Sequence, residues 1–219
     1  MRVFVILIAI GLIGCKSKPA ELKIGNWRGV ITLQNHQLPF NFEVTKDSGE
    51  YKVFLKNAEE KLLQDEISIE GDSVKITMLI FDIELRAKIN GGQLNGYYFK
   101  NYDPDFKLPF TADFNQNYRF VKQGTSLTDF SGKYEVKFTT ANKTYPSVAI
   151  FEQKENIVTG TFLTPTGDYR YLEGNVVNDT LLLSTFDGNH AFLFSAQMVG
   201  DSLIGDYYSG KSKIGRAHV

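Results

Sequence analysis

The feature that most constrains the fold is an alternation of apolar and polar residues with a period of two, which begins near residue 22. Phe40, Phe42 and Val44 alternate with polar residues, a Lys-Asp-Ser-Gly turn follows, and the alternation resumes at Tyr51. Turn-forming residues recur about every 8 to 12 positions, the spacing typical of short antiparallel strands. Because no segment carries a sustained helical stripe, the sequence predicts an all-β fold.

The β-rich region also contains an internal repeat. Four landmarks of the first half recur in the same order in the second half, three of them 107 positions later and the last 109 positions later. The matched segments are 25–27 with 132–134, 38–39 with 145–146, 71–74 with 178–181, and 94–98 with 203–207. We therefore expect two tandem homologous antiparallel β units, sandwich-like or barrel-like, at 22–121 and 128–213, joined by a polar linker at 122–126.

The second unit is expected to be truncated. In the first copy Tyr97-Tyr98 is followed by a further strand at 108–114, whereas the chain ends soon after Tyr207-Tyr208. Residues 214–219 also match one reading frame of a common sequencing adapter, so we expect them to be a non-native tail and the natural gene to continue past Lys213. The missing strand would leave an unpaired sheet edge.

The amino terminus predicts an anchor. Met1-Arg2 precedes eleven apolar residues, too few for the roughly 20 that span a membrane but typical of a signal peptide. Leu-Ile-Gly-Cys at 12–15 resembles the lipobox of bacterial lipoproteins. That resemblance implies a signal peptide at 1–14, a lipidated linker at 15–21, and a membrane tether through acyl chains on Cys15. A plain secretory signal with an incidental cysteine is the alternative.

The residue after the cysteine bears on localisation. Lys16 is not the aspartate that resembles an inner-membrane retention signal. We therefore expect a protein of the bacterial cell envelope that is lipid-anchored and faces the periplasm, with the outer membrane preferred.

Composition excludes several classes of function. The chain has 24 basic and 25 acidic residues, so it lacks the basic footprint of a nucleic-acid partner. One cysteine permits no internal disulfide, no CxxC redox motif and no cysteine-based zinc site. Three scattered histidines argue against a histidine metal cluster. We expect no metal and no cofactor.

The densest polar and aromatic segments are 168–174 and 184–190. They supply the candidate ligand-binding residues, which are Tyr169, Arg170, Glu173, Asp187 and His190. A hydrolase reading needs Asp168, Glu173 and Asp187 to converge as general acid and base. In the structural alternative, Arg170 pairs with a cross-strand carboxylate and 187–189 form a turn. Since His190 has no visible nucleophile or orienting partner, we expect it to be structural and assign no catalytic residue.

Tyrosines offer a second candidate groove. Tyr97, Tyr98 and Tyr102, or Tyr207 and Tyr208, could stack on sugar rings. The alternative is that they are core residues and cross-strand pairs of the β units.

Three segments of the second unit, 167–174, 181–194 and 201–210, resemble a region of TlpA-like thiol–disulfide oxidoreductases of bacteria. Those lipoproteins carry a β-rich segment between the lipid anchor and a thioredoxin-like domain with a WCxxC motif, which this sequence lacks. The resemblance implies a non-catalytic scaffolding or recognition module, whose partner is a downstream thioredoxin-like domain or another envelope protein. The alternative is a free-standing lipoprotein that binds a glycan or peptide.

Overall fold

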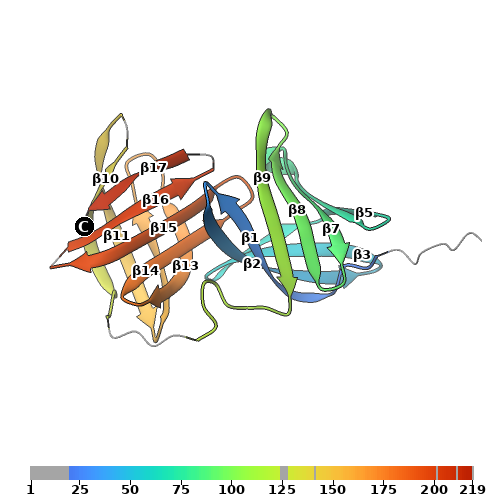
Figure 1. The fold of residues 1–219 in the computed structure, drawn as a ribbon, viewed down its shortest axis with the longest axis horizontal. Helices are drawn as coiled ribbons and strands as arrows, with labels where there is room; N and C mark the ends of the chain where they lie inside the picture. The colour runs from blue at the N-terminus through green and yellow to red at the C-terminus, as the bar shows by residue number, and fades with distance from the viewer. Residues whose placement is uncertain (1–19, 124–127, 141, 201, 211, 219) are drawn as a thin grey trace, which may run out of the picture.

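The computed structural model describes residues 20–123, 128–140, 142–200, 202–210 and 212–218. These residues form seventeen strands, β1 to β17, and one short 3₁₀ segment, η1, with no α-helix among them. The strands form two separate antiparallel sheets. The predicted all-β fold with two tandem β units is therefore confirmed (Figure 1).

The first unit holds nine strands and η1. They are β1 (Gly25–Leu33), β2 (His36–Asp47), β3 (Glu50–Asn57), β4 (Glu60–Gln64), β5 (Glu66–Glu70), β6 (Ser73–Met78), η1 (Leu79–Phe81), β7 (Ile83–Asn90), β8 (Gln93–Lys100) and β9 (Asp103–Phe114). The second unit holds eight strands. They are β10 (Gly132–Thr139), β11 (Thr144–Lys154), β12 (Ile157–Leu163), β13 (Tyr169–Val177), β14 (Thr180–Phe186), β15 (Ala191–Val199), β16 (Ser202–Ser209) and β17 (Ser212–His218).

The period-two pattern decides which face of each strand is buried. In β9, Phe106, Leu108 and Phe110 point into the core, while Lys107 and Pro109 between them are exposed. Successive side chains of a strand point to opposite faces, so an alternating sequence buries one face only. Each sheet therefore curls around its apolar face.

The first sheet remains open. Its strand order is β4-β3-β2-β1-β9-β8-β7-β6-β5, so β4 and β5 form its two edges. These edge strands are consecutive in the chain and are separated only by Asp65. The sheet thus curls far enough to bring its edges together at one point without pairing them.

The second sheet is a closed eight-stranded barrel in which β10 pairs with both β11 and β17. The expectation of an unpaired edge in this unit is wrong, because the backbone of β17 lies between β16 and β10. This strand takes the place that β9 has in the first unit, where β9 lies between β8 and β1. The non-native origin of 214–219 stays a prediction.

The two units share one strand plan. Strands β1 to β3 correspond to β10 to β12, and β6 to β9 correspond to β14 to β17. In the second unit the fourth strand, β13, pairs with β12 on one side and β14 on the other. In the first unit the same position holds β4, which pairs with β3, and β5, which pairs with β6. The first sheet is therefore a barrel whose fourth strand is broken at Asp65.

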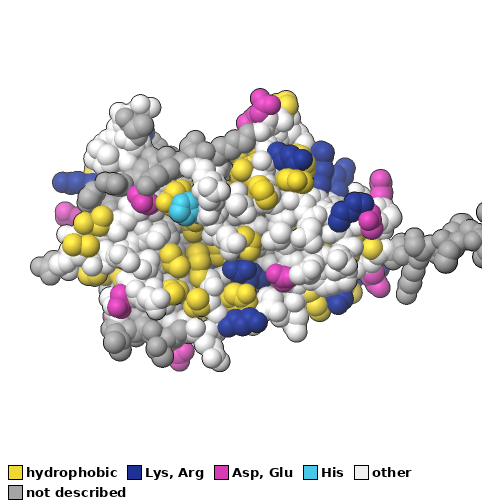
Figure 2. Space-filling model, in the orientation of Figure 1, with side chains coloured by type: hydrophobic (Ala, Val, Ile, Leu, Met, Phe, Trp, Pro, Cys, Tyr) yellow, Lys and Arg dark blue, Asp and Glu magenta, His cyan; other side chains and the backbone are white. Residues whose placement is uncertain are grey.

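The second unit fills the open side of the first. Phe186 and Ala191, at the facing ends of β14 and β15, are buried in the core of the first unit. The Phe186 ring centroid lies 4.6 Å from that of Phe40 and 5.4 Å from that of Tyr98. Figure 2 shows hydrophobic side chains gathered near the middle of this face of the molecule, where Figure 1 places the junction of the units.

Buried hydrogen bonds fix this docking. The Asn57 side-chain amide donates to the carbonyl of Phe186 at 2.9 Å and accepts from its N–H at 3.1 Å. The Tyr98 hydroxyl donates to the Gly188 carbonyl at 3.0 Å, and burial raises the pKa of this tyrosine, so it stays a donor. Buried polar groups need such partners, so the two units are held in one orientation.

Several predicted features lie outside the described residues. They are the signal peptide at 1–14, Cys15 with most of the linker at 15–21, and most of the linker at 122–126. Within the part of the chain that the structure describes, no helix has the length and apolar character needed to cross a membrane.

Candidate functional site: a cleft between the two units

A cleft of about 700 Å³ lies where the broken strand of the first unit meets the second unit. It is lined by residues of four segments, which are 60–66 of β4 and β5, 77–81 at the end of β6 and η1, 166–171 before and within β13, and 185–192 of β14 and β15. The first two segments border the break at Asp65. The cleft is thus the space between β4 and the end of β6, which opens because the fourth strand is broken at Asp65.

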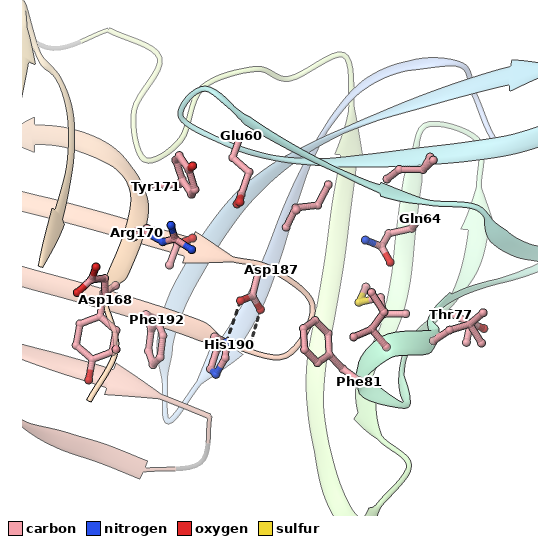
Figure 3. A pocket seen from close by; sticks show the side chains of 18 of the residues that line it. Glu60, Gln64, Thr77, Phe81, Asp168, Arg170, Tyr171, Asp187, His190 and Phe192 are labelled. Carbon is pink, nitrogen blue, oxygen red and sulfur yellow. Dashed lines mark hydrogen bonds and ion pairs between the residues drawn. The ribbon is translucent and has the colours of Figure 1, made fainter. Parts of the chain in front are cut away.

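Asp187 and His190 form the central polar pair of the cleft (Figure 3). The Asp187 carboxylate accepts hydrogen bonds from the backbone N–H of Asn189 at 2.9 Å and of His190 at 2.6 Å. It also accepts from the His190 ring Nδ1 at 2.9 Å. The His190 ring stacks on Phe192, with ring centroids 5.4 Å apart. The expectation that His190 lacks an orienting partner is wrong, since Asp187 orients it across a tight turn.

These hydrogen bonds decide the charge of Asp187. Burial alone would raise the pKa of its carboxyl, but hydrogen bonds from the ring and backbone of His190 and from the Asn189 N–H outweigh burial. The pKa is therefore held below its usual range. A hydrogen bond to the charged form favours ionisation, so Asp187 presents a fixed negative charge to the cleft.

Glu60 faces this charge from the first unit. Burial and the charge of Asp187 raise the pKa of the Glu60 carboxyl, while Arg170 acts in the opposite direction. Figure 3 shows Glu60, Arg170 and Asp187 around the same part of the cleft. Two carboxylates and one guanidinium from three separate segments thus meet there.

Arg170 reaches the cleft because of a β-bulge. The pairing of β12 with β13 shifts register between Gly160 and Phe162, opposite Arg170 and Tyr171. Tyr171 has a φ of +55°, a left-handed conformation that is strained for a residue with a side chain. Bulges re-aim side chains at barrel rims, and this one directs 169–171 toward the cleft, which all three residues line.

Tyr169 lies between the cleft and the core of the second barrel and contacts both. It packs with the buried residues of that core, and its hydroxyl lies 3.3 Å from the hydroxyl of Tyr145. Burial raises the pKa of Tyr169 to about 12, so its hydroxyl is neutral at physiological pH. The residue can therefore offer a ligand a ring and a neutral hydroxyl.

Glu173 is the candidate that the cleft does not include. One of its carboxylate oxygens accepts a hydrogen bond from the Ala58 N–H at 2.9 Å and lies 3.3 Å from a guanidinium nitrogen of Arg119. Arg119 is buried, so this ion pair ties β13 to the first unit. Asp168, Glu173 and Asp187 do not converge in one cleft, as the hydrolase alternative would need. Only the two aspartates line the cleft, and Figure 3 shows Asp168 apart from Asp187, on the far side of Arg170.

The tyrosine rows are divided between core and surface. Tyr98, Tyr207 and Tyr208 are buried, as the core alternative predicts. Tyr97 and Tyr102 are exposed, and the Lys107 ammonium lies 3.8 Å from the centroid of the Tyr97 ring. Neither row forms a continuous exposed platform for a sugar.

Four of the five predicted ligand-binding residues line the cleft, but the residues that the first unit contributes were not predicted. The missed residues include Glu60, Leu63 and the apolar tip formed by Leu79, Ile80 and Phe81. One signal was present, because three large apolar residues in a row at 79–81 interrupt the alternation between two strands. No group of three or more metal-ligating side chains exists among the described residues.

Comparisons with protein-family models, with curated proteins and with solved structures found no match to this chain.

Proposed function

We propose that this chain is a lipid-anchored, non-catalytic recognition module of the bacterial cell envelope, and that its ligand binds in the cleft between the two units. One observation carries the proposal. The cleft has the volume of a ligand site and combines aromatic and apolar walls with a few converging charged groups. Arg170, Asp187 and His190 lie at its centre, held by a bulge and a tight turn.

The rigidity of the walls supports binding. The β14–β15 turn that carries Asp187 and His190 is fixed by the hydrogen bonds of Asn57 and Tyr98. A site whose walls are already ordered loses little conformational entropy when a ligand binds. The exposed apolar side chains at its rim, Leu79 and Ile80, are also typical of an interaction surface.

Within this proposal the chain serves as the recognition part of a periplasmic thiol–disulfide oxidoreductase. The redox chemistry would belong to a thioredoxin-like domain with its own WCxxC motif, because an acylated Cys15 has no free thiol. The second candidate is a free-standing lipoprotein that binds a glycan or peptide, and the same cleft favours it. The genomic sequence beyond codon 213 separates the two, since a downstream WCxxC supports the first and an early stop codon supports the second.

The proposal is tested by screening the purified protein against a glycan array and a peptide library. Binding is then compared between the wild type and two variants, Arg170→Ala and Ile80→Ser, whose side chains are exposed in the cleft. The matched control is Val199→Ser, which changes another exposed apolar residue at the opposite end of β15. We expect both cleft variants to lose binding and the control to keep it. Absence of any ligand, or equal binding by all four proteins, would contradict the proposal.

A further inference from the structure

We infer that the ligand of the cleft is an extended polypeptide segment, which adds as a strand to the open edge of β4. The inference rests on the proposed function, since it names the class of ligand for that cleft. It has three supports, which are the backbone of β4, the comparison of the two units, and the side chains around the cleft.

The first support is the direction of the β4 backbone. Asn57 and Glu60 flank a two-residue turn and face each other across β3 and β4, so they form a hydrogen-bonded pair. Hydrogen bonding alternates along an antiparallel ladder. Leu62 and Gln64 therefore also bond to β3, while the N–H and C=O groups of Lys61 and Leu63 point to the opposite side. None of the described strands pairs with that side of β4.

The second support is the complete barrel in the same chain. In the second unit, β13 is one continuous strand and is paired along its outer side with β14 from Glu173 to Val177. Residues 173–175 of β13 also pair with β12, so one strand joins both halves of that barrel. In the first unit β4 pairs only with β3 and β5 only with β6, so no residue of the broken strand has a neighbour on both sides. The free side of β4 borders the cleft, across which lie residues 77–81, and an extended peptide there would give β4 its second neighbour.

The edge of β5 is a poorer candidate. The cleft is lined by Leu62, Leu63 and Gln64 of β4, but of β5 it includes only Glu66. The N–H of Ile67 already donates to the Asp65 carbonyl at 3.2 Å. Glutamates stand at both ends of β5, and charges of this kind discourage strand pairing. The open edge that combines free backbone groups with a hollow is β4.

The third support gives the chemistry of the peptide. Three exposed apolar side chains surround the β4 edge, with exposed fractions of 47% for Leu63, 66% for Leu79 and 91% for Ile80. The lining also carries more carboxylates than cations, namely Glu60, Asp65, Glu66, Asp168 and Asp187 against Arg170. A peptide that alternates apolar and basic residues complements both features, because alternate side chains of a strand point to opposite faces.

The test uses a fluorescein-labelled peptide, Lys-Val-Lys-Val-Lys-Val-Lys, and measures its binding to the full chain by fluorescence anisotropy. Two further peptides carry N-methyl groups, one on the lysine amides and one on the valine amides. Only one edge of an added strand pairs with β4, so one methylated peptide should lose about tenfold or more in affinity, while the other stays within about threefold. A Glu-Val peptide of the same length should bind more weakly than the Lys-Val peptide.

Two variants of the protein test the same edge. Leu63→Pro removes an N–H that points away from β3, a position where a sheet edge tolerates proline. Leu63→Ala removes the side chain and keeps the N–H, so it measures the contribution of the side chain alone. We expect the affinity of Leu63→Pro to lie about tenfold below that of Leu63→Ala, because only the proline also removes the N–H. In the wild type, hydrogen exchange of the Lys61 and Leu63 amides should slow when the peptide binds, which needs no variant.

The outcomes separate this inference from the proposed function. If a peptide binds in the cleft but both methylated peptides bind equally and the two amides exchange unchanged, strand addition is wrong and the cleft remains a binding site. The same holds if only glycans bind and Arg170→Ala abolishes that binding. If neither peptides nor glycans bind, the inference and the proposed function both fail.

Discussion

Replacing Asn57 by alanine tests whether the two units form one cooperative structure. The Asn57 side chain has no exposed surface, and its amide makes two hydrogen bonds with the backbone of Phe186, at 2.9 and 3.1 Å. Asn57→Ala leaves the N–H and C=O of Phe186 buried without these partners. Each buried group left unsatisfied costs about 1 to 3 kcal/mol, so we expect the free energy of unfolding to fall by about 2 to 6 kcal/mol.

Urea unfolding provides the assay, because the chain contains a single tryptophan. Trp27 is buried in the first unit and stacks with Phe42, so its fluorescence reports on that unit, while far-UV circular dichroism reports on both units. We expect coincident transitions by the two probes in the wild type, as for a two-state protein. The control is Asn101→Ala, since Asn101 is exposed and bonds to Asp82 within the first unit. A loss below about 1 kcal/mol for Asn57→Ala, or separate transitions in the wild type, would refute the reasoning.

The remaining predictions concern the docking of the units, the charges and the proposed lipid anchor. Gly188→Ala places a Cβ 2.7 Å from a methionine sulfur at a φ of +103°, so thermal unfolding should show a loss of about 1 to 3 kcal/mol. Glu173→Ala leaves the buried Arg119 unpaired and should cost roughly 3 kcal/mol or more in urea unfolding, with ligand affinity unchanged. The folded state raises the pKa of Glu60 and so binds its proton more tightly than the unfolded state. This carboxyl therefore lowers stability as pH rises from about 4.5 toward 7, and the stability gained by Glu60→Gln over the wild type should grow over that range. Cys15→Ala should move the protein from the membrane fraction to the soluble fraction and abolish its labelling by radioactive palmitate.

Local patterns were sufficient to predict the strands and the repeat. The turn at Gly71-Asp72, with a φ of +62° at the glycine, corresponds to the turn at Asn178-Asp179, with φ values of +48° and +58°. Residues that tolerate positive φ are recognisable in a sequence, so hairpins and their repetition can be predicted. The closure of one sheet and the opening of the other depend on pairing between distant strands, which local patterns do not encode.

The sequence predicted only those parts of the site whose residues lie close together in the chain. Asp187 and His190 are three residues apart and meet across one turn, whereas Asn57 and Phe186 are separated by 129 residues. The bulge also explains why Glu173, a predicted ligand-binding residue, lies outside the cleft. Tyr169 and Leu172 both pack inside the barrel although they are three residues apart, so the period-two pattern changes face between them. Glu173 therefore points outward to Arg119, and alternation alone could not predict this.

The broken fourth strand also has a consequence for the order of folding during synthesis. The first unit has all its strands once β9 is made, yet its core still lacks Phe186 and Ala191 from the second unit. About 70 residues of chain separate these points, which corresponds to roughly 4 to 14 s of translation. During that interval the growing chain displays the apolar concave face of an open sheet. A holding chaperone that binds nascent chains should therefore associate with intermediates that end between β9 and β14 and release them once β15 has emerged.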